Sequence, residues 1–312
     1  MKAIGEYTIS IIVPIQNEED NISKLIERLK KVLDRKQEFE IIFVDDGSID
    51  NTLEVLKQFH KSDSRIKYLS FSRNFGHQNA LRAGMDFAEG DCVISLDGDL
   101  QHPPELIPEM IEKWQEGYEI VYTLRRDDVK ISFIKRKTSQ LFYTLMNRLS
   151  DIEIEQGSAD FRLIDRSVLN VLSRFQENPI FYRGLIRWLG FRQYALAYIP
   201  EKRTWGETKY SFKRMLKFAL TGITSFSIQP LHMSTILGSI IALVSFLYGI
   251  YAIFMKLFTT QTIPGWTSLL IVVSFIGGIQ LLMIGILGEY LGKLFIESKR
   301  RPAYIIREKS IK

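Results

Sequence analysis

The segment CVISLDGDLQHPPE, from Cys92 to Glu105, contains a short apolar run that ends at a cluster of acidic and polar side chains. A run of four to eight apolar residues bounded by turn residues is typical of a strand buried in a parallel sheet. The residues from Cys92 to Leu96 fit this pattern, and Asp97 and Asp99 follow directly. In open sheets of this kind, ligands bind beyond the carboxyl ends of the strands. The segment therefore predicts a buried strand that presents two carboxylates to a ligand.

Similar apolar runs recur along the first part of the chain, with helix-like segments between them. The other runs are Thr8 to Val13, Glu40 to Val44, Ile66 to Phe71 and Ile120 to Thr123. The expected helices are Ile22 to Leu33, Thr52 to Phe59, Asn79 to Ala88 and Glu105 to Trp114. Strands that alternate with helices of this length are typical of a mainly parallel sheet covered on both faces. The predicted fold class is therefore α/β, with a Rossmann-like domain over residues 1–208.

Two stretches nearer the C-terminus, Ser234 to Met255 and Thr267 to Gly288, contain no Asp, Glu, Lys or Arg. As a helix rising about 1.5 Å per residue, each would reach roughly 33 Å, enough to cross a hydrocarbon core about 30 Å thick. Helices buried in a soluble core usually keep a polar face, which these stretches lack. We therefore expect two transmembrane helices within residues 232–298, followed by a basic cytoplasmic tail at 299–312.

Basic residues flank the two stretches but are missing from the loop between them, Thr259 to Trp266. Flanks rich in Lys and Arg stay in the cytoplasm by the positive-inside rule. The N-terminal sequence lacks the pattern of a signal peptide, so we expect the first domain and both termini to be cytoplasmic. Lys209 to Ile223 mixes basic and apolar residues at helical spacing, which predicts an amphipathic interfacial helix within residues 209–231.

The overall composition favours a folded protein at a lipid bilayer. Apolar residues make up 46% of the chain and charged residues 25%, as in ordinary folded proteins, which excludes a mainly disordered chain. The formal net charge of +5 owes much to the basic residues beside the apolar stretches. It therefore favours anionic headgroups and phosphates as partners, and we expect no nucleic acid. The single cysteine, Cys92, is expected to be a small buried hydrophobe.

Two further predicted strands also end in polar clusters, at Pro14 to Glu18 and at Asp45 to Ser48. So many carboxylates at one sheet edge would repel one another and raise their pKa values unless a cation lay among them. The Asp97 and Asp99 carboxylates and the Gln101 carbonyl are hard oxygen ligands suited to Mg²⁺ or Mn²⁺. Such ions usually also bind substrate phosphates, so a nucleotide diphosphate is the expected ligand.

Taken together, these motifs resemble those of the family 2 inverting glycosyltransferases. The matching segments are Pro14 to Glu18, Val44 to Ser48, Ser72 to Gly76, Asp97 to Glu105, Asp160 to Leu163 and Trp205 to Tyr210. Within that family the chain is most similar to the polyprenyl- and dolichyl-phosphate sugar synthases. Because two apolar stretches follow the first domain, it is closest to the bacterial enzymes that glucosylate undecaprenyl phosphate. The resemblance implies a GT-A fold in a cytoplasmic catalytic domain attached to the bacterial inner membrane.

The resemblance also implies a role for each group of residues. The nucleotide is expected at Pro14, Asn17, Glu18, Asp45, Arg73 and Asp97, and the metal at Asp97, Asp99 and Gln101. Cations for the acceptor phosphate are expected from Arg125 and Arg136, with Lys209 near the diphosphate or the acceptor. Asp160 is expected to orient the acceptor or to act as a base. His77 and His102 have no zinc-binding spacing around them and are expected to play supporting roles at most.

The implied activity is metal-dependent transfer of a hexose from a nucleotide sugar to polyprenyl phosphate, with inversion. UDP-glucose is the first expected donor and GDP-mannose the second. A processive polysaccharide synthase is disfavoured, because two spans are too few for a channel and Gly184 to Trp188 lacks the Gln of a Gln-x-x-Arg-Trp motif. A non-catalytic scaffold that binds nucleotide sugars stays open as an alternative. Gly288 and Gly292 allow close helix packing, either with the first span or in a homo-oligomer.

Overall fold

The computed structural model describes residues 7–33, 38–125, 157–175, 177, 180–199, 227–258 and 265–311. The chain forms two compact units. The sheet unit comprises most of the sequence before the apolar stretches together with Pro302–Lys312, and the helical unit contains the apolar stretches. The predicted amphipathic helix at Lys209 to Ile223 lies outside the described residues.

The described part of the sheet unit is built on eight strands in the order β7-β5-β6-β4-β1-β2-β3-β8. Their bounds are β1 Thr8–Ile15, β2 Glu38–Asp45, β3 Ile66–Phe71, β4 Cys92–Ser95, β5 Ile120–Arg125, β6 Ser158–Asp165, β7 Gln193–Tyr198 and β8 Ile306–Lys309. The four strands β4, β1, β2 and β3 are parallel, which confirms the predicted core of the sheet. The sheet is nevertheless mixed, because β6 is antiparallel to both β4 and β5, and β8 is antiparallel to β3.

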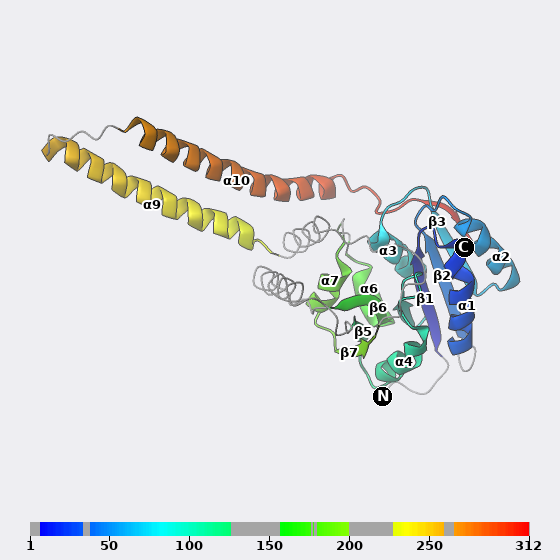
Figure 1. Ribbon diagram of the computed structural model, residues 1–312. Coiled ribbons are helices and arrows are strands. Elements are labelled where there is room, and N and C mark those ends of the chain that lie inside the picture. Colours follow the sequence, from blue (N-terminus) through cyan, green and yellow to red (C-terminus); the bar gives the residue numbers. More distant parts are fainter. Residues whose placement is uncertain are drawn as a thin grey trace. The chain divides into compact units, whose positions relative to one another are not determined.

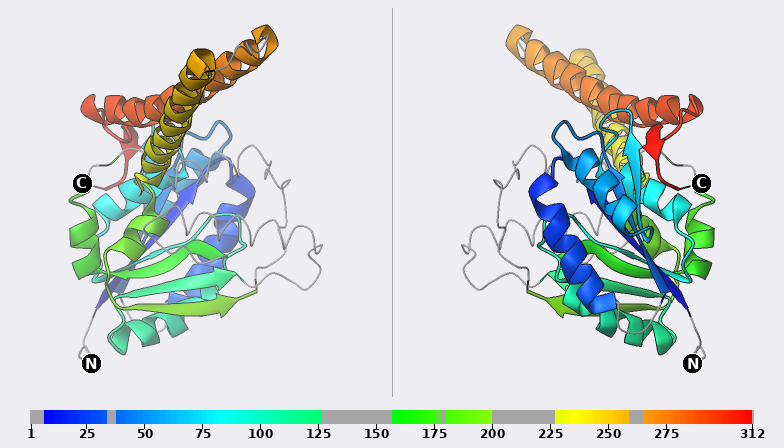
Figure 2. Two further views of the ribbon diagram at one scale, coloured as in Figure 1. Left: turned by 90° about the vertical axis from the view of Figure 1, so that its left-hand side faces the viewer. Right: turned by 90° about the vertical axis from the view of Figure 1, so that its right-hand side faces the viewer.

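Helices cover both faces of this sheet (Figures 1 and 2). They are α1 Glu19–Leu33, α2 Thr52–Ser62, α3 His77–Phe87, α4 Ile107–Gln115 after the 3-10 turn η1 Pro104–Leu106, α6 Arg166–Leu172 and α7 Tyr182–Trp188. Alternate residues of a strand point to opposite faces. Ile9, Ile11 and Val13 of β1 are fully buried in one core with apolar residues of α1, α2 and α4. Ile12 points the other way, towards α3.

The C-terminal segment adds a strand to the sheet that the sequence analysis did not anticipate. The sequence predicts only a basic tail at 299–312, whereas Ile306–Lys309 pairs with β3. The Ser72 N–H also donates to the Ile305 carbonyl at 3.0 Å. The polypeptide therefore leaves the sheet unit, forms the helical unit and then re-enters the sheet unit.

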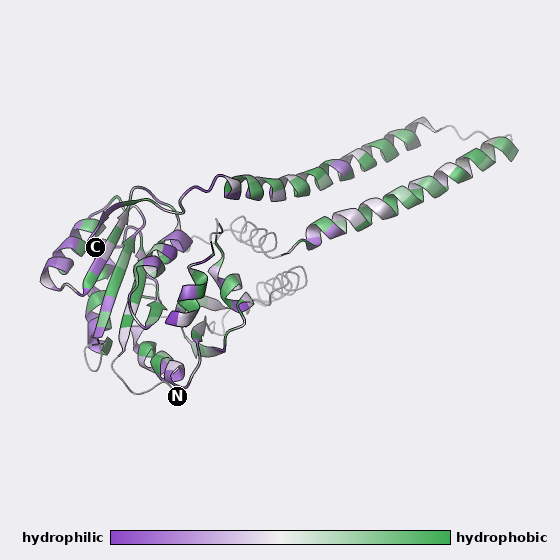
Figure 3. Cartoon of the chain, turned by 180° about the vertical axis from the view of Figure 1, so that it is seen from behind, coloured by the Kyte–Doolittle hydropathy of each residue, from purple (hydrophilic) through white to green (hydrophobic). Residues whose placement is uncertain are grey.

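The helical unit contains α9 Gln229–Phe258 and α10 Trp266–Ser298. Both are long and apolar enough to cross a membrane, over Gln229–Met255 and Val272–Ser298. Figure 3 shows hydrophobic residues along most of both helices, without the polar face of a soluble core helix. These helices agree with the two spans expected from the sequence.

Gly84 shows how closely α3 approaches the sheet. A Cβ added at Gly84 would lie 2.2 Å from Cγ2 of Ile12. In an open helix, Gly→Ala would stabilise by about 1 kcal/mol. In a packed core, an added methyl group lowers the free energy of unfolding by about 1–3 kcal/mol, so we expect the steric clash to outweigh the gain in helix propensity here.

We therefore predict that Gly84→Ala lowers the midpoint of thermal unfolding of the detergent-solubilised protein. Gly84→Ala should cost less in an Ile12→Ala background than in the wild type, because the truncated Ile12 leaves room for the new methyl group. A single Gly84→Ala variant that melts above the wild type would contradict the packing described for this helix.

Candidate active site

A cavity of about 390 Å³ lies where β1, β2 and β4 end. Its walls are formed by Pro14 to Gln16 and Glu18 after β1, by Asp46 after β2, and by Asp97 to Asp99 after β4. The first residues of α3 and Asp160 of β6 complete it. Because parallel strands end at the same edge of a sheet, segments that are distant in sequence meet here, as the polar clusters predicted.

Acidic side chains dominate the cavity. Five carboxylates line it, those of Glu18, Asp46, Asp97, Asp99 and Asp160. Among the described residues, only one side chain that can carry positive charge lines it as well, that of His77. The cavity is therefore suited to a ligand that brings cations of its own.

The turn from Asp97 to His102 is held by its own hydrogen bonds. The Asp97 N–H donates to Nδ1 of the buried His102 at 3.0 Å, and the Gln101 N–H donates to Asp99 Oδ1 at 3.1 Å. Leu100 has a positive φ of 61°, a conformation that costs a bulky residue about 1–3 kcal/mol and is typical of functional loops. A Cβ on Gly98 would lie 2.5 Å from Cγ2 of Ile15. This turn is thus fixed in a strained shape that presents both aspartates to the cavity.

The carboxylate of Asp97 fits a metal ligand. Its Oδ1 is buried and accepts no hydrogen bond from any described residue, although His77 Nε2 lies 3.5 Å away. A buried oxygen without a hydrogen bond lowers the stability of the folded protein unless a cation or a hydrogen-bond donor binds to it. The described residues contain no group of three or more His, Cys, Asp or Glu side chains that could hold a metal by themselves. A cation at Asp97 and Asp99 would therefore need oxygen ligands from a bound molecule, as Mg²⁺ commonly takes from phosphates.

The two neighbouring aspartates at the end of β2, Asp45 and Asp46, have different positions. Asp46 lines the cavity and accepts the N–H groups of Phe75 and Gly76 at 2.6 and 2.9 Å. Burial raises the pKa of Asp46, although these two hydrogen bonds oppose the shift. Asp45 is not part of the cavity wall, because its carboxylate accepts from the Ser48 N–H at 2.9 Å and the Ser70 hydroxyl at 2.8 Å. Asp45 thus shapes the loop, and Asp46 joins that loop to the start of α3.

Asp160 is a buried carboxylate enclosed by cations. Arg183 of α7 donates to it through two nitrogens, from Nε to Oδ1 at 3.0 Å and from Nη2 to Oδ2 at 2.9 Å. The buried Arg162 donates to Oδ1 at 3.0 Å. Burial alone would raise the pKa of Asp160, but Arg183, His77 and Arg162 outweigh it and hold the pKa well below its usual range. Asp160 is therefore ionised and is a weak base.

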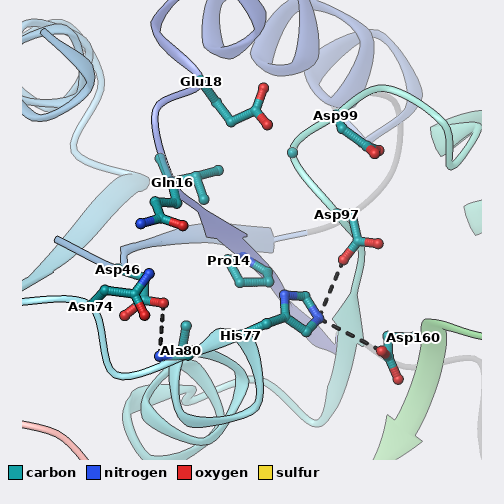
Figure 4. Close-up of a pocket in the computed structure, with 13 residues that line it drawn as sticks. Pro14, Gln16, Glu18, Asp46, Asn74, His77, Ala80, Asp97, Asp99 and Asp160 are labelled. Carbon is teal, nitrogen blue, oxygen red and sulfur yellow. Dashed lines mark hydrogen bonds and ion pairs between the residues drawn. The ribbon is translucent and has the colours of Figure 1, made fainter. Parts of the chain in front are cut away.

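His77 lies between the two carboxylates that the sequence analysis assigned to different halves of the site. Its Nε2 is 3.5 Å from Asp97 Oδ1 and 3.7 Å from Asp160 Oδ2, as the dashed lines in Figure 4 show. Burial lowers the pKa of His77, but Asp160 and Asp97 outweigh it, so the net shift is upward. The two carboxylates thus favour the protonated, positively charged form of His77, which lines the acidic cavity.

The structure brings together only some of the residues predicted for the site. Those in the cavity wall are Pro14, Glu18, Asp97, Asp99 and Asp160. Those described but outside the wall are Asn17, Asp45, Arg73, Gln101 and Arg125. The Arg73 guanidinium lies 4.0 Å from the centre of the Phe75 ring, and Arg125 is exposed at the end of β5. The last two, Arg136 and Lys209, lie outside the described residues.

Three residues at or beside the site were not predicted, Asp46, Asn74 and Arg183, and His77 was expected to play a supporting role at most. Asp46 and Asn74 lie inside segments already recognised as motifs, so their positions carried a signal that was not used. His77 directly follows one of those segments, and its distance from Asp160 depends on the fold. Arg183 carried no local signal, because its partner Asp160 belongs to a different element.

The chain is similar to a family model, to whole sequences of known proteins and to a solved structure. Residues 10–172 match the family model described as glycosyl transferase family 2. A Bacillus subtilis protein described as an uncharacterized glycosyltransferase is 46% identical over 96% of this chain and 93% of its own length. The bactoprenol glucosyl transferase of Shigella phage SfV is 41% identical over 97% of this chain and 99% of its own length. A solved mannosyltransferase from Pyrobaculum calidifontis is 15% identical over 92% of this chain and 88% of that one, with a TM-score of 0.47.

Asp160→Asn tests the charge balance of the buried cluster. The amide keeps the shape of the side chain but removes the negative charge that Arg162 and Arg183 contact, a change that typically costs about 3–5 kcal/mol. We predict a clearly lower midpoint of thermal unfolding, whereas Glu112→Gln on the exposed surface of α4 should leave it unchanged.

The pH dependence of this loss has a defined sign. The pKa of Asp160 is lower in the folded protein than in the unfolded chain, where it is about 3.9. Its ionised carboxylate therefore adds to the free energy of unfolding above that unfolded-state pKa, and this stabilisation is lost as the pH falls towards the folded-state pKa. The difference in unfolding free energy between Asp160→Asn and the wild type should therefore shrink below about pH 4. Between about pH 5 and 8 it should be larger on the acidic side, because Asp160 also raises the pKa of His77. Equal melting of the two proteins at pH 7 would contradict the cluster described above.

Proposed function

The chain belongs to glycosyl transferase family 2, and on that premise we propose that it transfers glucose from UDP-glucose to a polyprenyl phosphate, with inversion at the sugar. The observation that carries this proposal is the acidic cavity at the strand ends, in which one buried oxygen of Asp97 accepts no hydrogen bond from the described residues. Relatives named bactoprenol glucosyl transferases match nearly the whole chain, which supports glucose as the sugar and a polyprenyl phosphate as the acceptor.

In this proposal, Asp97, Asp99 and Gln101 would hold Mg²⁺ or Mn²⁺. When bound, the ion would neutralise charge that develops on the leaving diphosphate. Hard oxygen ligands and the buried acceptor of Asp97 support this assignment. The nucleotide would occupy the same cavity, with Pro14 and Glu18 in its wall and Asn17, Asp45 and Arg73 supporting the surrounding loops.

Asp160 then orients groups and does not act as a base. A phosphate monoester has a second pKa near 6 and is already largely dianionic at neutral pH, so its oxygen can attack without losing a proton to the enzyme. A carboxylate whose pKa is held well below the usual range would be a poor proton acceptor in any case. Asp160 fixes Arg183, and it lies 3.7 Å from the His77 ring. Positioning and charge stabilisation are the catalytic contributions expected of this cluster.

The acceptor phosphate requires cations at the edge of the cavity. We assign Arg125 to this role, with Arg136 and Lys209 as further candidates from the segments outside the described residues. Guanidinium groups suit phosphate because they can donate two parallel hydrogen bonds. Arg125 ends β5, which pairs with the strand that carries Asp160, and this pairing supports its assignment to the acceptor side.

The helical unit suits an acceptor whose lipid chain stays in a bilayer. The chain forms part of the sheet unit both before α9 and after α10, so two crossings return it to the side from which it left. The basic flanks of α9 and α10 support the cytoplasm as that side. The reaction would then take place at the cytoplasmic face of the membrane.

Transfer of radiolabelled sugar to undecaprenyl phosphate in detergent tests the proposal. We predict an organic-extractable product with UDP-glucose, formed with Mg²⁺ or Mn²⁺ and abolished by EDTA. Asp99→Asn should reduce the rate at least about a hundredfold, because it weakens the metal site, whereas Glu112→Gln should not. Product only from GDP-mannose would correct the donor, and no product from any donor would contradict the proposed reaction.

Arg125→Ala tests the acceptor assignment separately. Loss of a guanidinium that binds the acceptor phosphate should raise the KM for undecaprenyl phosphate about tenfold or more and leave the KM for the sugar donor nearly unchanged. Lys24→Ala, on the exposed face of α1, serves as a matched removal of one surface charge. If only the donor KM changed, Arg125 would belong to the nucleotide side of the site.

A further inference from the structure

The C-terminal segment makes several contacts with the rest of the sheet unit, and one group of them leads towards a loop that lines the cavity. Away from the cavity wall, Glu308 pairs with Lys57 at 3.1 Å and accepts from the Tyr68 hydroxyl at 2.9 Å. Closer to the wall, Tyr304 stacks on Phe71, the last residue of β3, with ring centres 5.2 Å apart and planes 12° apart. The loop that follows Phe71 carries Asn74 and Gly76, which line the cavity.

Tyr304 is held by α3 as well as by β3. Its hydroxyl donates to Asp86 Oδ2 at 2.9 Å. Burial and the neighbouring Asp86 raise the pKa of Tyr304, so the hydroxyl keeps the proton that it donates. The Ser72 N–H donates to the Ile305 carbonyl at 3.0 Å. The C-terminal segment therefore contacts both β3, which precedes the Ser72 to Gly76 loop, and α3, which follows it.

A continuous set of contacts leads from Tyr304 to the cavity. Phe71 packs edge-on against Phe75, with ring centres 5.7 Å apart. The Phe75 and Gly76 N–H groups donate to the two oxygens of Asp46, which lines the cavity. Displacement of Phe71 would disturb Phe75 and, through its N–H group, the Asp46 carboxylate.

We propose that Tyr304 is a positioning residue for the donor site, through which the segment after the second span holds the Ser72 to Gly76 loop in the shape that binds the nucleoside diphosphate. The proposal rests on the proposed function for the identity of the ligand. The same sheet that builds the nucleotide site thus includes the end of the membrane-anchoring segment. Loss of this contact weakens nucleotide binding without altering the acceptor side.

The test measures UDP binding directly, by titration calorimetry of the full-length protein in detergent with Mn²⁺. Tyr304→Ala should weaken UDP binding roughly tenfold, the scale on which residues remote from a ligand modulate its affinity. Tyr304→Phe keeps the ring stack and loses only the hydrogen bond to Asp86, so it should fall between Tyr304→Ala and the wild type. Arg307→Ala, on the exposed side of β8, should bind UDP as the wild type does.

Two further measurements separate positioning from general destabilisation. Hydrogen exchange of the Phe75 and Gly76 amides should accelerate in Tyr304→Ala but not in Arg307→Ala, while amides in the middle of β1 stay protected in both. The KM for undecaprenyl phosphate should not change. Where Tyr304→Ala does not fold, Tyr304→Leu, which loses the ring stack but keeps a large apolar side chain, carries the same comparison.

The outcomes are distinguishable from a failure of the proposed function. If the wild-type protein binds no nucleoside diphosphate, the proposed function fails, and this inference fails with it. If the wild type binds UDP and a folded Tyr304→Ala binds it equally well with unchanged exchange at Phe75 and Gly76, only the positioning role is overturned, and the segment is merely a tether.

Discussion

Repulsion among carboxylates gathered at one sheet edge is the constraint on which the rest of the structure depends. Parallel strands β1, β2 and β4 end together, and the residues beyond them bring Glu18, Asp46, Asp97 and Asp99 into one cavity. Such a cluster is stable only if each charge is compensated, hydrogen-bonded or neutralised by a proton. The individual carboxylates meet this requirement in different ways. In one part of the cavity protein groups compensate the charge, and in the other part a ligand is needed to do so.

Asp160 and Asp97 differ in how their negative charge is compensated. Asp160 is compensated within the protein by Arg162 and Arg183, which fix its charge and its orientation. Asp97 is not compensated to the same degree, since one of its oxygens is buried without a hydrogen bond from the described residues. His77 stands between them, and its Nε2 lies within ion-pair distance of both carboxylates. One side of the site is thus compensated within the protein, whereas the other would be completed by the proposed cation and diphosphate.

Much of this could be predicted from the sequence, because the signals were local. Apolar runs predicted the central parallel strands, and uncharged stretches predicted α9 and α10. Acidic residues directly after strands predicted the position of the cavity. Pairings between distant segments could not be predicted in the same way. The antiparallel β6, which brings Asp160 to the cavity, and Arg183, which holds it, depend on tertiary contacts. The strand β8 reads Ile-Arg-Glu-Lys, and a single apolar residue gives no periodic pattern by which a strand can be recognised.

The central claim is that the acidic cavity binds a nucleoside diphosphate only together with a divalent cation. Binding of Mn²⁺, followed by electron paramagnetic resonance with and without UDP, measures this coupling directly. The account predicts weak Mn²⁺ binding to the protein alone, tight stoichiometric binding when UDP is present, and an equal gain in UDP affinity when Mn²⁺ is present, because the coupling is reciprocal. UDP affinity that is the same with Mn²⁺ and with EDTA would contradict the account.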